Sequence, residues 1–116
     1  MKVIIAVSRD IISYEEVCKA VLNSGVAITE LLYLVVPGVT TLPERWAAEN
    51  NVPVKAFEAE KAKFGHRAGP ILATKICQEA DALIVVWDGK SKSVRYLMNA
   101  ALDNQTVVYT HIVTGE

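Results

Sequence analysis

Short, uninterrupted apolar runs constrain the fold of this chain more than any other feature. Residues 2–7 read KVIIAV, and residues 82–86 read ALIVV. An alternating strand buries one face, whereas a continuous apolar strand needs cover on both faces. Both runs are far shorter than the ~20 residues of a membrane-spanning helix. They therefore predict buried strands of a parallel sheet.

Helical and strand patterns alternate along the rest of the chain. Ser13 suits a helix N-cap, and Gly25 suits the end of the same helix. The remaining elements follow by their apolar spacing and their Pro, Gly and Asn breaks. Further strands are expected at 28–36, 52–57 and 106–113, and further helices at 41–49, 70–79 and 94–102. About five alternations with short connections predict an α/β fold, a three-layer sandwich with a mostly parallel five-stranded sheet.

Composition favours one domain spanning 1–116. The chain has 116 residues, of which 52% are hydrophobic, enough to bury a core. Its net charge of -1 gives no bulk attraction to DNA or to a membrane, so neither is expected as a partner. Cys18 and Cys77 fall in helix-like stretches without a CxxC motif and are expected to be buried thiols. With no signal-peptide pattern, a cytoplasmic protein is expected.

The segment 88–93, which reads DGKSKS, is the most informative candidate site. It follows an apolar run and precedes a helical pattern, and a helix N-terminus offers unpaired N–H groups and a positive dipole end to an anion. A Walker A match fails because its glycine spacing is absent. The alternative is an ordinary solvated turn. The candidate ligand-binding residues here are Asp88, Gly89, Lys90, Ser91 and Ser93.

Other candidates follow the remaining strands, where parallel sheets bind ligands. Residues 8–10, which are Ser8, Arg9 and Asp10, are candidates for hydrogen bonds to a ribose or base, or else form a strand exit with a helix cap. Gly38, Thr40 and Thr41 are candidates for a remnant anion site, or else a turn with an N-cap. Gly69 stands in a loop beside a helix start, where His66 or Arg67 would neutralise an anion, although a plain loop is the favoured interpretation.

The sequence assigns no catalytic residue, metal site or cofactor. The two His and two Cys lack zinc-ligand spacing. Glu44 falls beside Arg45 in a helical pattern and is interpreted as a surface charge. Trp46 and Trp87 are expected to be core or interface aromatics. His111 lies in a strand pattern and is expected to be structural.

Six short segments occur in the order and spacing of a known family. They are SRD at 8–10, ERWA at 44–47, VPV at 52–54 with Phe57, KFG at 63–65 followed by AGPI at 68–71, ADALI at 80–84, and WDGKSK at 87–92. Together they resemble the YspA-like (DUF2493) branch of the SLOG superfamily, Rossmann-like domains related to the DprA and LOG (lysine-decarboxylase-like) proteins. The resemblance implies a nucleotide or nucleotide-derived ligand and a homodimer. Some relatives hydrolyse nucleoside monophosphates at the glycosidic bond, and others sense NAD-derived signals.

The chain departs from the family at four polar positions. The family's glycine-rich turn, GGARGxD, is replaced by LVVPGVT at 34–40, so that only Gly38 remains. Glycines let backbone N–H groups approach a phosphate, and Val35 and Val36 do not. The other replacements are Glu60-Lys61 for Asp-Trp, Leu72-Ala73 for Arg-Asn, and Ser93-Val94 for Gly-Thr.

These departures favour a divergent, non-enzymatic domain that binds a nucleotide-derived ligand. So short and altered a member would suit a small genome, such as that of a phage. Two alternatives remain open. One is a hydrolase of the N-glycosidic bond with a reorganised site, in which Asp10, Glu44 or Glu60 supplies the carboxylate. The other is a structural or protein-interaction module whose cleft is filled by Val35, Val36 and Leu72.

Overall fold

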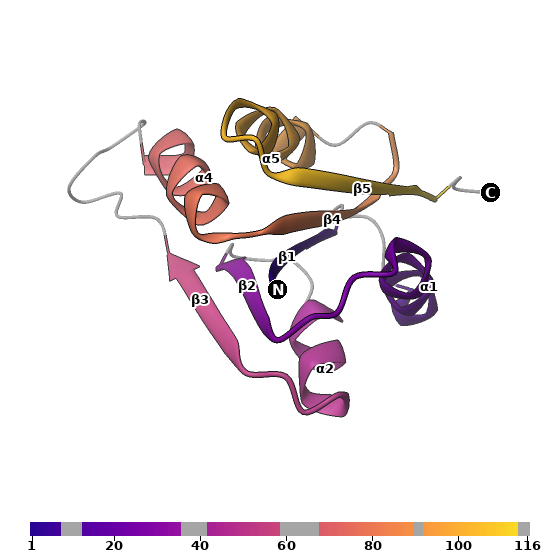
Figure 1. Cartoon of the computed structure of the whole chain (residues 1–116). Coiled ribbons are helices and arrows are strands. Elements are labelled where there is room, and N and C mark those ends of the chain that lie inside the picture. The colour runs from indigo at the N-terminus through magenta and orange to yellow at the C-terminus, as the bar shows by residue number, and fades with distance from the viewer. Residues whose placement is uncertain (8–12, 36–41, 59–67, 90–91, 114–116) are drawn as a thin grey trace.

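Strands and helices alternate through the described part of the chain, which in this computed structural model comprises residues 1–7, 13–35, 42–58, 68–89 and 92–113 (Figure 1). The elements are, in order, β1 (Lys2–Val7), α1 (Tyr14–Ser24), β2 (Glu30–Val35), α2 (Leu42–Glu49), β3 (Val54–Glu58), α4 (Ala68–Glu79), β4 (Ala82–Trp87), α5 (Lys92–Asp103) and β5 (Val107–Ile112).

All five strands pair in parallel, in the order β3-β2-β1-β4-β5. Val3 of β1 stands between Leu31 of β2 and Ala82 of β4. Helices α1 and α2 pack on one face of this sheet, and α4 and α5 pack on the other. The α/β prediction is confirmed as a Rossmann-like three-layer sandwich.

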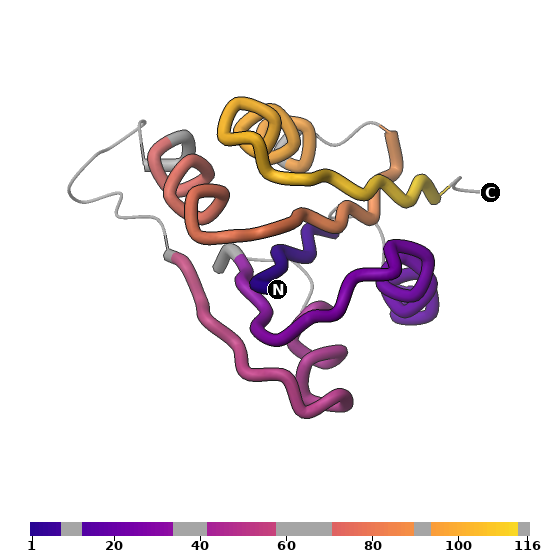
Figure 2. Tube along the Cα trace, viewed as in Figure 1, coloured from indigo at the N-terminus to yellow at the C-terminus, as the bar shows by residue number. Residues whose placement is uncertain are grey.

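Two hydrophobic clusters fill the spaces between the layers. Val3 and Ile5 of β1 face α1 and α2, while Ile4 between them faces α4 and α5. Side chains alternate across a strand, so neighbouring residues of one central strand serve different clusters. Figure 2 traces β1 and β4 through the middle of the molecule. Their position explains why both strands are apolar along their whole length.

Element boundaries differ from the expectations by one or two residues. α4 begins at Ala68 and therefore includes Pro70 in its first turn, where the missing N–H of proline costs no helical hydrogen bond. β2 begins at Glu30 rather than residue 28, and just before it the Thr29 N–H donates to the Met1 carbonyl at 2.9 Å.

The expected ends of α1 are confirmed for the backbone. Gly25 adopts a left-handed conformation, φ 68°, and its N–H donates to the Leu22 carbonyl. No atom lies within 4 Å of where its Cβ would stand, so conformation and not crowding favours glycine. Ser13 occupies the N-cap position in an extended conformation, but its hydroxyl makes no capping bond. The prediction was therefore right for the position and wrong for the side chain.

The two thiols differ in their surroundings. Cys77 is 1% exposed, and this burial raises its pKa to about 11. Cys18 is only half-buried, so the expectation of burial is confirmed for Cys77 and wrong for Cys18. Both are free cysteines. In the part of the chain that the structure describes, no helix has the length and apolar character needed to cross a membrane.

Substitutions at a buried and an exposed leucine test whether β4 lies inside the sheet. Leu83 is 0% exposed, whereas Leu22 on α1 is 80% exposed. Leu83→Ala should lower the free energy of unfolding by about 2–5 kcal/mol through lost transfer energy and a cavity. Leu22→Ala should change it by less than about 0.5 kcal/mol. Urea denaturation followed by circular dichroism measures both, and equal losses would contradict this placement of β4.

Candidate functional site

The strand order defines where a ligand cleft belongs in this sheet. From β1 the chain moves outward to β2 and β3, and then α4 carries it back to β4 on the other side of β1. Open parallel sheets bind ligands beyond the carboxyl ends of strands at such a reversal. Val7 and Val86 are register partners near those ends. The candidate site is therefore the carboxyl edge at β1 and β4.

Several predicted ligand-binding residues lie outside the described residues. Residues 8–10 follow β1, residues 38, 40 and 41 precede α2, and residues 90 and 91 follow β4. The residues concerned are Ser8, Arg9, Asp10, Gly38, Thr40, Thr41, Lys90 and Ser91. Gly69 and Ser93 are placed by backbone, in the first turns of α4 and α5. These two turns belong to helices on the same face of the sheet.

The backbone around Asp88 and Gly89 has the predicted strand–turn–helix order. The Trp87 carbonyl, at the end of β4, accepts a hydrogen bond from the Val113 N–H at 2.8 Å. Gly89 then takes φ 82°, in the left-handed region that favours glycine. α5 begins three residues later, at Lys92. Asp88 is half-buried at this turn. Ligand contact at these residues stays a prediction.

A second pair of polar groups near this edge was missed by sequence reasoning. Tyr33 lies toward the carboxyl end of β2 and is half-buried, and Glu44 lies in the first turn of α2. Burial, and then the Glu44 carboxylate, raises the pKa of Tyr33 above its ordinary value. Glu44 is itself half-buried, so its interpretation as a surface charge was wrong.

The start of α1 is held against α2 by a cluster of four side chains. The Arg45 guanidinium carbon stands 4.1 Å from the centroid of the Tyr14 ring, and Arg45 Nε lies 3.0 Å from Glu49 Oε2. Burial raises the pKa of Tyr14, and hydrogen bonds with Glu49 and Cys18 raise it further. The cluster connects α2 to the start of α1, which begins directly after the segment that follows β1.

The two tryptophans and Leu72 are part of the packed layers. Trp46 packs against the cluster beneath α1 and α2, and Trp87 packs against the cluster beneath α4 and α5. The expectation that both are core or interface aromatics is confirmed, with both packed against the core. Leu72 of α4 is half-buried against the same cluster as Trp87.

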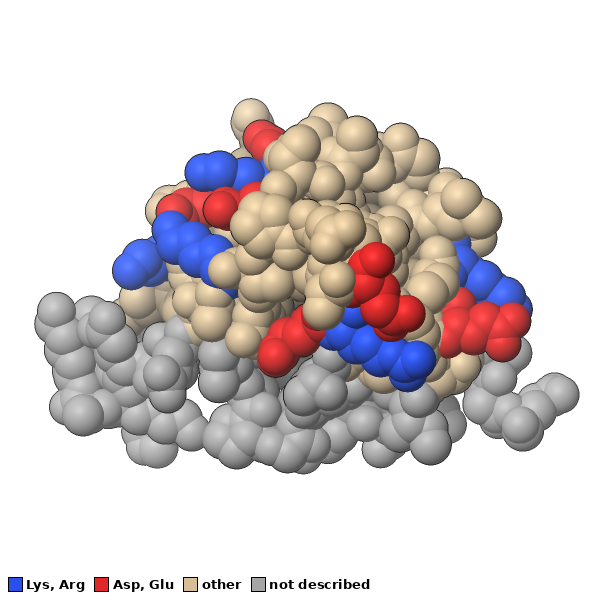
Figure 3. Space-filling model, turned by 90° about the horizontal axis from the view of Figure 1, so that it is seen from below, with Lys and Arg blue, Asp and Glu red and all other residues tan. Residues whose placement is uncertain are grey.

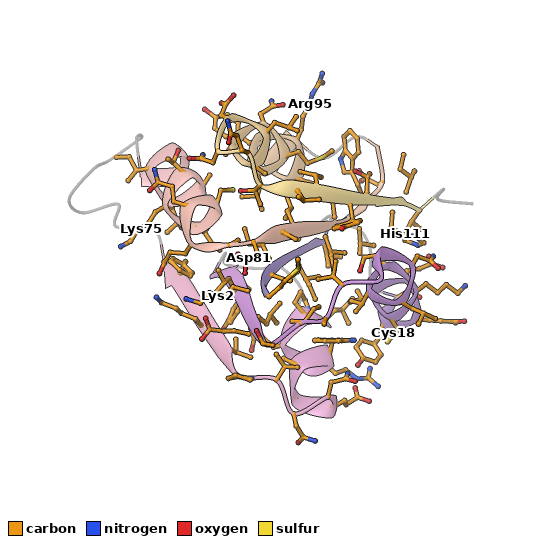
Figure 4. All side chains as sticks on the ribbon, viewed as in Figure 1. Lys2, Cys18, Lys75, Asp81, Arg95 and His111 are labelled. Carbon is orange, nitrogen blue, oxygen red and sulfur yellow. The ribbon has the colours of Figure 1, made fainter. Side chains whose placement is uncertain are left out.

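His111 joins the edge strand β5 to α1. Its Nε2 lies 2.7 Å from Glu16 Oε2, and Figure 4 shows His111 beside α1. The hydrogen bond with His111 lowers the pKa of Glu16, and Lys19, with Nζ 3.6 Å from Glu16 Oε1, lowers it further. The contact connects two elements, the edge strand and the first helix.

Several charged side chains of the described residues form pairs of opposite sign. Lys19 lies beside Glu15 and Glu16, Arg45 beside Glu49, and Lys55 beside Glu79. On the face seen in Figure 3, the described acidic and basic groups accordingly stand next to one another. Paired charges of this kind give little long-range attraction for a polyanion.

Comparison with known protein families and with curated proteins finds no match to this chain. Among the described residues, no three His, Cys, Asp or Glu side chains come together as a metal-binding group.

The contact between Glu16 and His111 predicts a specific acid dependence of stability. A carboxyl whose pKa is lowered on folding contributes stability above its unfolded pKa, which is lost as pH falls through the folded value. Wild type should therefore lose stability as pH falls from about 4.5 through that lowered value, and Glu16→Gln should lack this part of the loss.

Glu15→Gln is the matched control, because the Glu15 side chain is 78% exposed and contacts only Lys19 among the described ion pairs. Urea midpoints measured from pH 6 to pH 3 compare the three proteins. Parallel curves for wild type and Glu16→Gln would rule out the contact as a source of stability.

Proposed function

We propose that this chain is a divergent SLOG-like domain without enzymatic activity, which binds a nucleotide or nucleotide-derived ligand at the carboxyl edge of β1 and β4. The observation that carries the proposal is the strand order, because the reversal lies between the two strands that precede residues 8–10 and 88–93. Two of the six segments that carry the resemblance to the family, SRD at 8–10 and WDGKSK at 87–92, follow or overlap the ends of these strands.

Helix geometry supports an anionic ligand group. Every crossover in a parallel sheet brings the chain from the carboxyl edge of one strand to the amino edge of the next, so each helix begins at the carboxyl edge. The positive ends of α4 and α5 therefore stand on the same side of the sheet as the end of β4. The sequence adds Lys90 and Lys92, with Ser91 and Ser93, at the start of α5. A phosphate is the group that this combination suits.

Two observations favour binding over hydrolysis. The glycine-rich turn of the family is replaced by valines at 35 and 36, which removes close backbone approach to a phosphate at β2. Glycosidic hydrolysis uses a pair of carboxyl groups or an equivalent acid and base. Glu44, a candidate carboxylate, hydrogen-bonds to Tyr33 beneath α2.

A reducing, cytoplasmic compartment belongs to the same proposal. Its support is the chemistry of the thiols, since Cys18 and Cys77 are both free.

A thermal-shift screen with AMP, ADP-ribose, NAD and cyclic nucleotides tests the proposal. A ligand that binds the folded chain stabilises it by mass action, by about 2.7 kcal/mol at a hundred times its Kd, and should raise Tm by several degrees. Lys90→Ala should lose the shift, because it removes a charge at the start of α5. Lys61→Ala, a lysine beyond the end of β3, should keep it.

Three other outcomes would change the proposed function or the place of the site. No shift at millimolar ligand would reject nucleotide binding and favour the protein-interaction alternative. Release of free base from a nucleoside monophosphate would instead identify a hydrolase. A thermal shift that persists in Lys90→Ala would mean that the anion does not bind at the loop after β4.

A further inference from the structure

The two outer strands of the sheet are protected to different degrees. β3 follows Pro53 and carries Lys55, whose Nζ lies 2.9 Å from Glu79 Oε1. Proline and lysine are devices that keep an edge strand from pairing with another chain. β5 reads VVYTHI and contains no Lys, Arg, Asp, Glu or Pro. The β5 edge therefore lacks the protection that the β3 edge has.

Apolar side chains are exposed at both ends of β5. Val107 is 53% exposed, and Ile112 is 58% exposed. Thr110, between them, is also exposed. β-branched residues favour β-strands. A partner that covered Val107 and Ile112 would add the free energy of burying their apolar surface.

The direction of the backbone groups on β5 follows from its pairing with β4. Trp87 is the register partner of Ile112, and its carbonyl accepts the N–H of Val113. In a parallel ladder the residue opposite Trp87 then turns its own N–H and C=O away from β4. By the two-residue repeat of a strand, Val108 and Thr110 do the same.

We propose that two copies of this chain pair through β5, antiparallel, about a two-fold axis at Thr110, and so form one continuous sheet. Thr110 would face the partner's Thr110, and Val108 would face the partner's Ile112. All outward N–H and C=O groups of these residues then meet in hydrogen-bonded pairs. The pairing is isologous and brings no like charges together.

Exposed apolar groups gain cover on both faces of this joint. Ile112 packs on the partner's Val108 on the side of α4 and α5. On the side of α1, Val107 meets the partner's Val113, which packs against the cluster on that face. Directly opposite side chains in an antiparallel pair stand within about 5.5 Å of one another at Cβ.

The adjacent register, centred on Tyr109, is weaker. It would need the backbone of Thr106 to pair with the partner's Ile112. The Thr106 N–H already donates to the Ala101 carbonyl at 2.8 Å, and its hydroxyl donates to the Cys77 carbonyl at 3.0 Å. Thr106 is also buried. The axis at Thr110 uses only residues whose backbone groups face outward.

Molar mass in solution tests the proposal directly. Analytical ultracentrifugation of wild type should give about twice the chain mass of 12.7 kDa. Thr110→Pro removes one outward N–H and leaves the ladder to β4 intact, since edge strands tolerate proline there. It should be monomeric. Thr110→Lys keeps the backbone and places like charges across the axis, so it should also weaken the dimer at least tenfold in Kd.

Ala56→Pro is the matched control on the other edge. The Leu31 N–H donates to the Pro53 carbonyl, so residues 53, 55 and 57 face β2 and Ala56 faces outward, as Thr110 does on β5. This variant should remain dimeric. Circular dichroism and Tm confirm that each variant is folded before its mass is interpreted.

A disulfide reports the register itself. A hydrogen-bonded antiparallel pair holds its Cα atoms about 5.5 Å apart, within the range that a disulfide spans. Thr110→Cys should give a covalent dimer on mild oxidation, while Ala56→Cys and wild type should not. A monomeric wild type at millimolar concentration, a dimer that survives both Thr110 variants, or cross-linking through Ala56→Cys alone would overturn the proposal.

Discussion

The burial of β1 and β4 on both faces is the constraint on which the rest of this structure depends. In β4, Leu83 and Ile84 are each 0% exposed, yet they face opposite layers. Such strands are stable only when helices cover both sides, and this requires crossovers that leave from one edge of the sheet. The same requirement gathers the helix N-termini at the carboxyl edge. The packing of the core thereby places the positive ends of the helices, which favour an anion, at one edge of the sheet.

Much of this architecture could be predicted from local pattern. The run at 2–7 is the strand that the structure shows, and Gly25 ends its helix with the expected left-handed backbone. The neighbours of each strand could not be predicted in the same way. Val3 pairs with Ala82, 79 residues further along the chain, because α4 carries the chain back across β1. That choice is made by packing of whole layers and leaves no local trace in sequence.

In the candidate site, too, one part could be predicted from local sequence pattern and another part depends on packing. The turn after β4 could be predicted, because an apolar run, a glycine and a helical pattern follow one another within a few residues. The pairs Tyr33 with Glu44 and His111 with Glu16 could not be predicted. Their partners come from different elements and meet only when helix and sheet pack. Glu44 looked like a surface charge because its helix carries Arg45 beside it, yet packing on β2 half-buries it.

The two proposals place the ligand and the second copy of the chain at different edges of the sheet. Its carboxyl edge at β1 and β4 is suited to a small anionic ligand, and its lateral edge at β5 is suited to another copy of the chain. Ligand groups placed beyond the strand ends need not compete with strands that add at the side. The bond between His111 and Glu16 fixes β5 to α1. It thus supports the outer strand through which the two copies are proposed to pair.

An amide NMR titration with ADP-ribose tests the central claim most directly, because every non-proline residue reports where the ligand lies. Shifts are predicted for Gly89 and the first turn of α5, together with the residues that follow β1. The amino edge, including Lys2 and Asp81, should stay unchanged, since its backbone is closed by the Lys2 N–H bond to Asp81 Oδ2 at 2.8 Å. Shifts confined to that edge, or none at saturating ligand, would contradict the account.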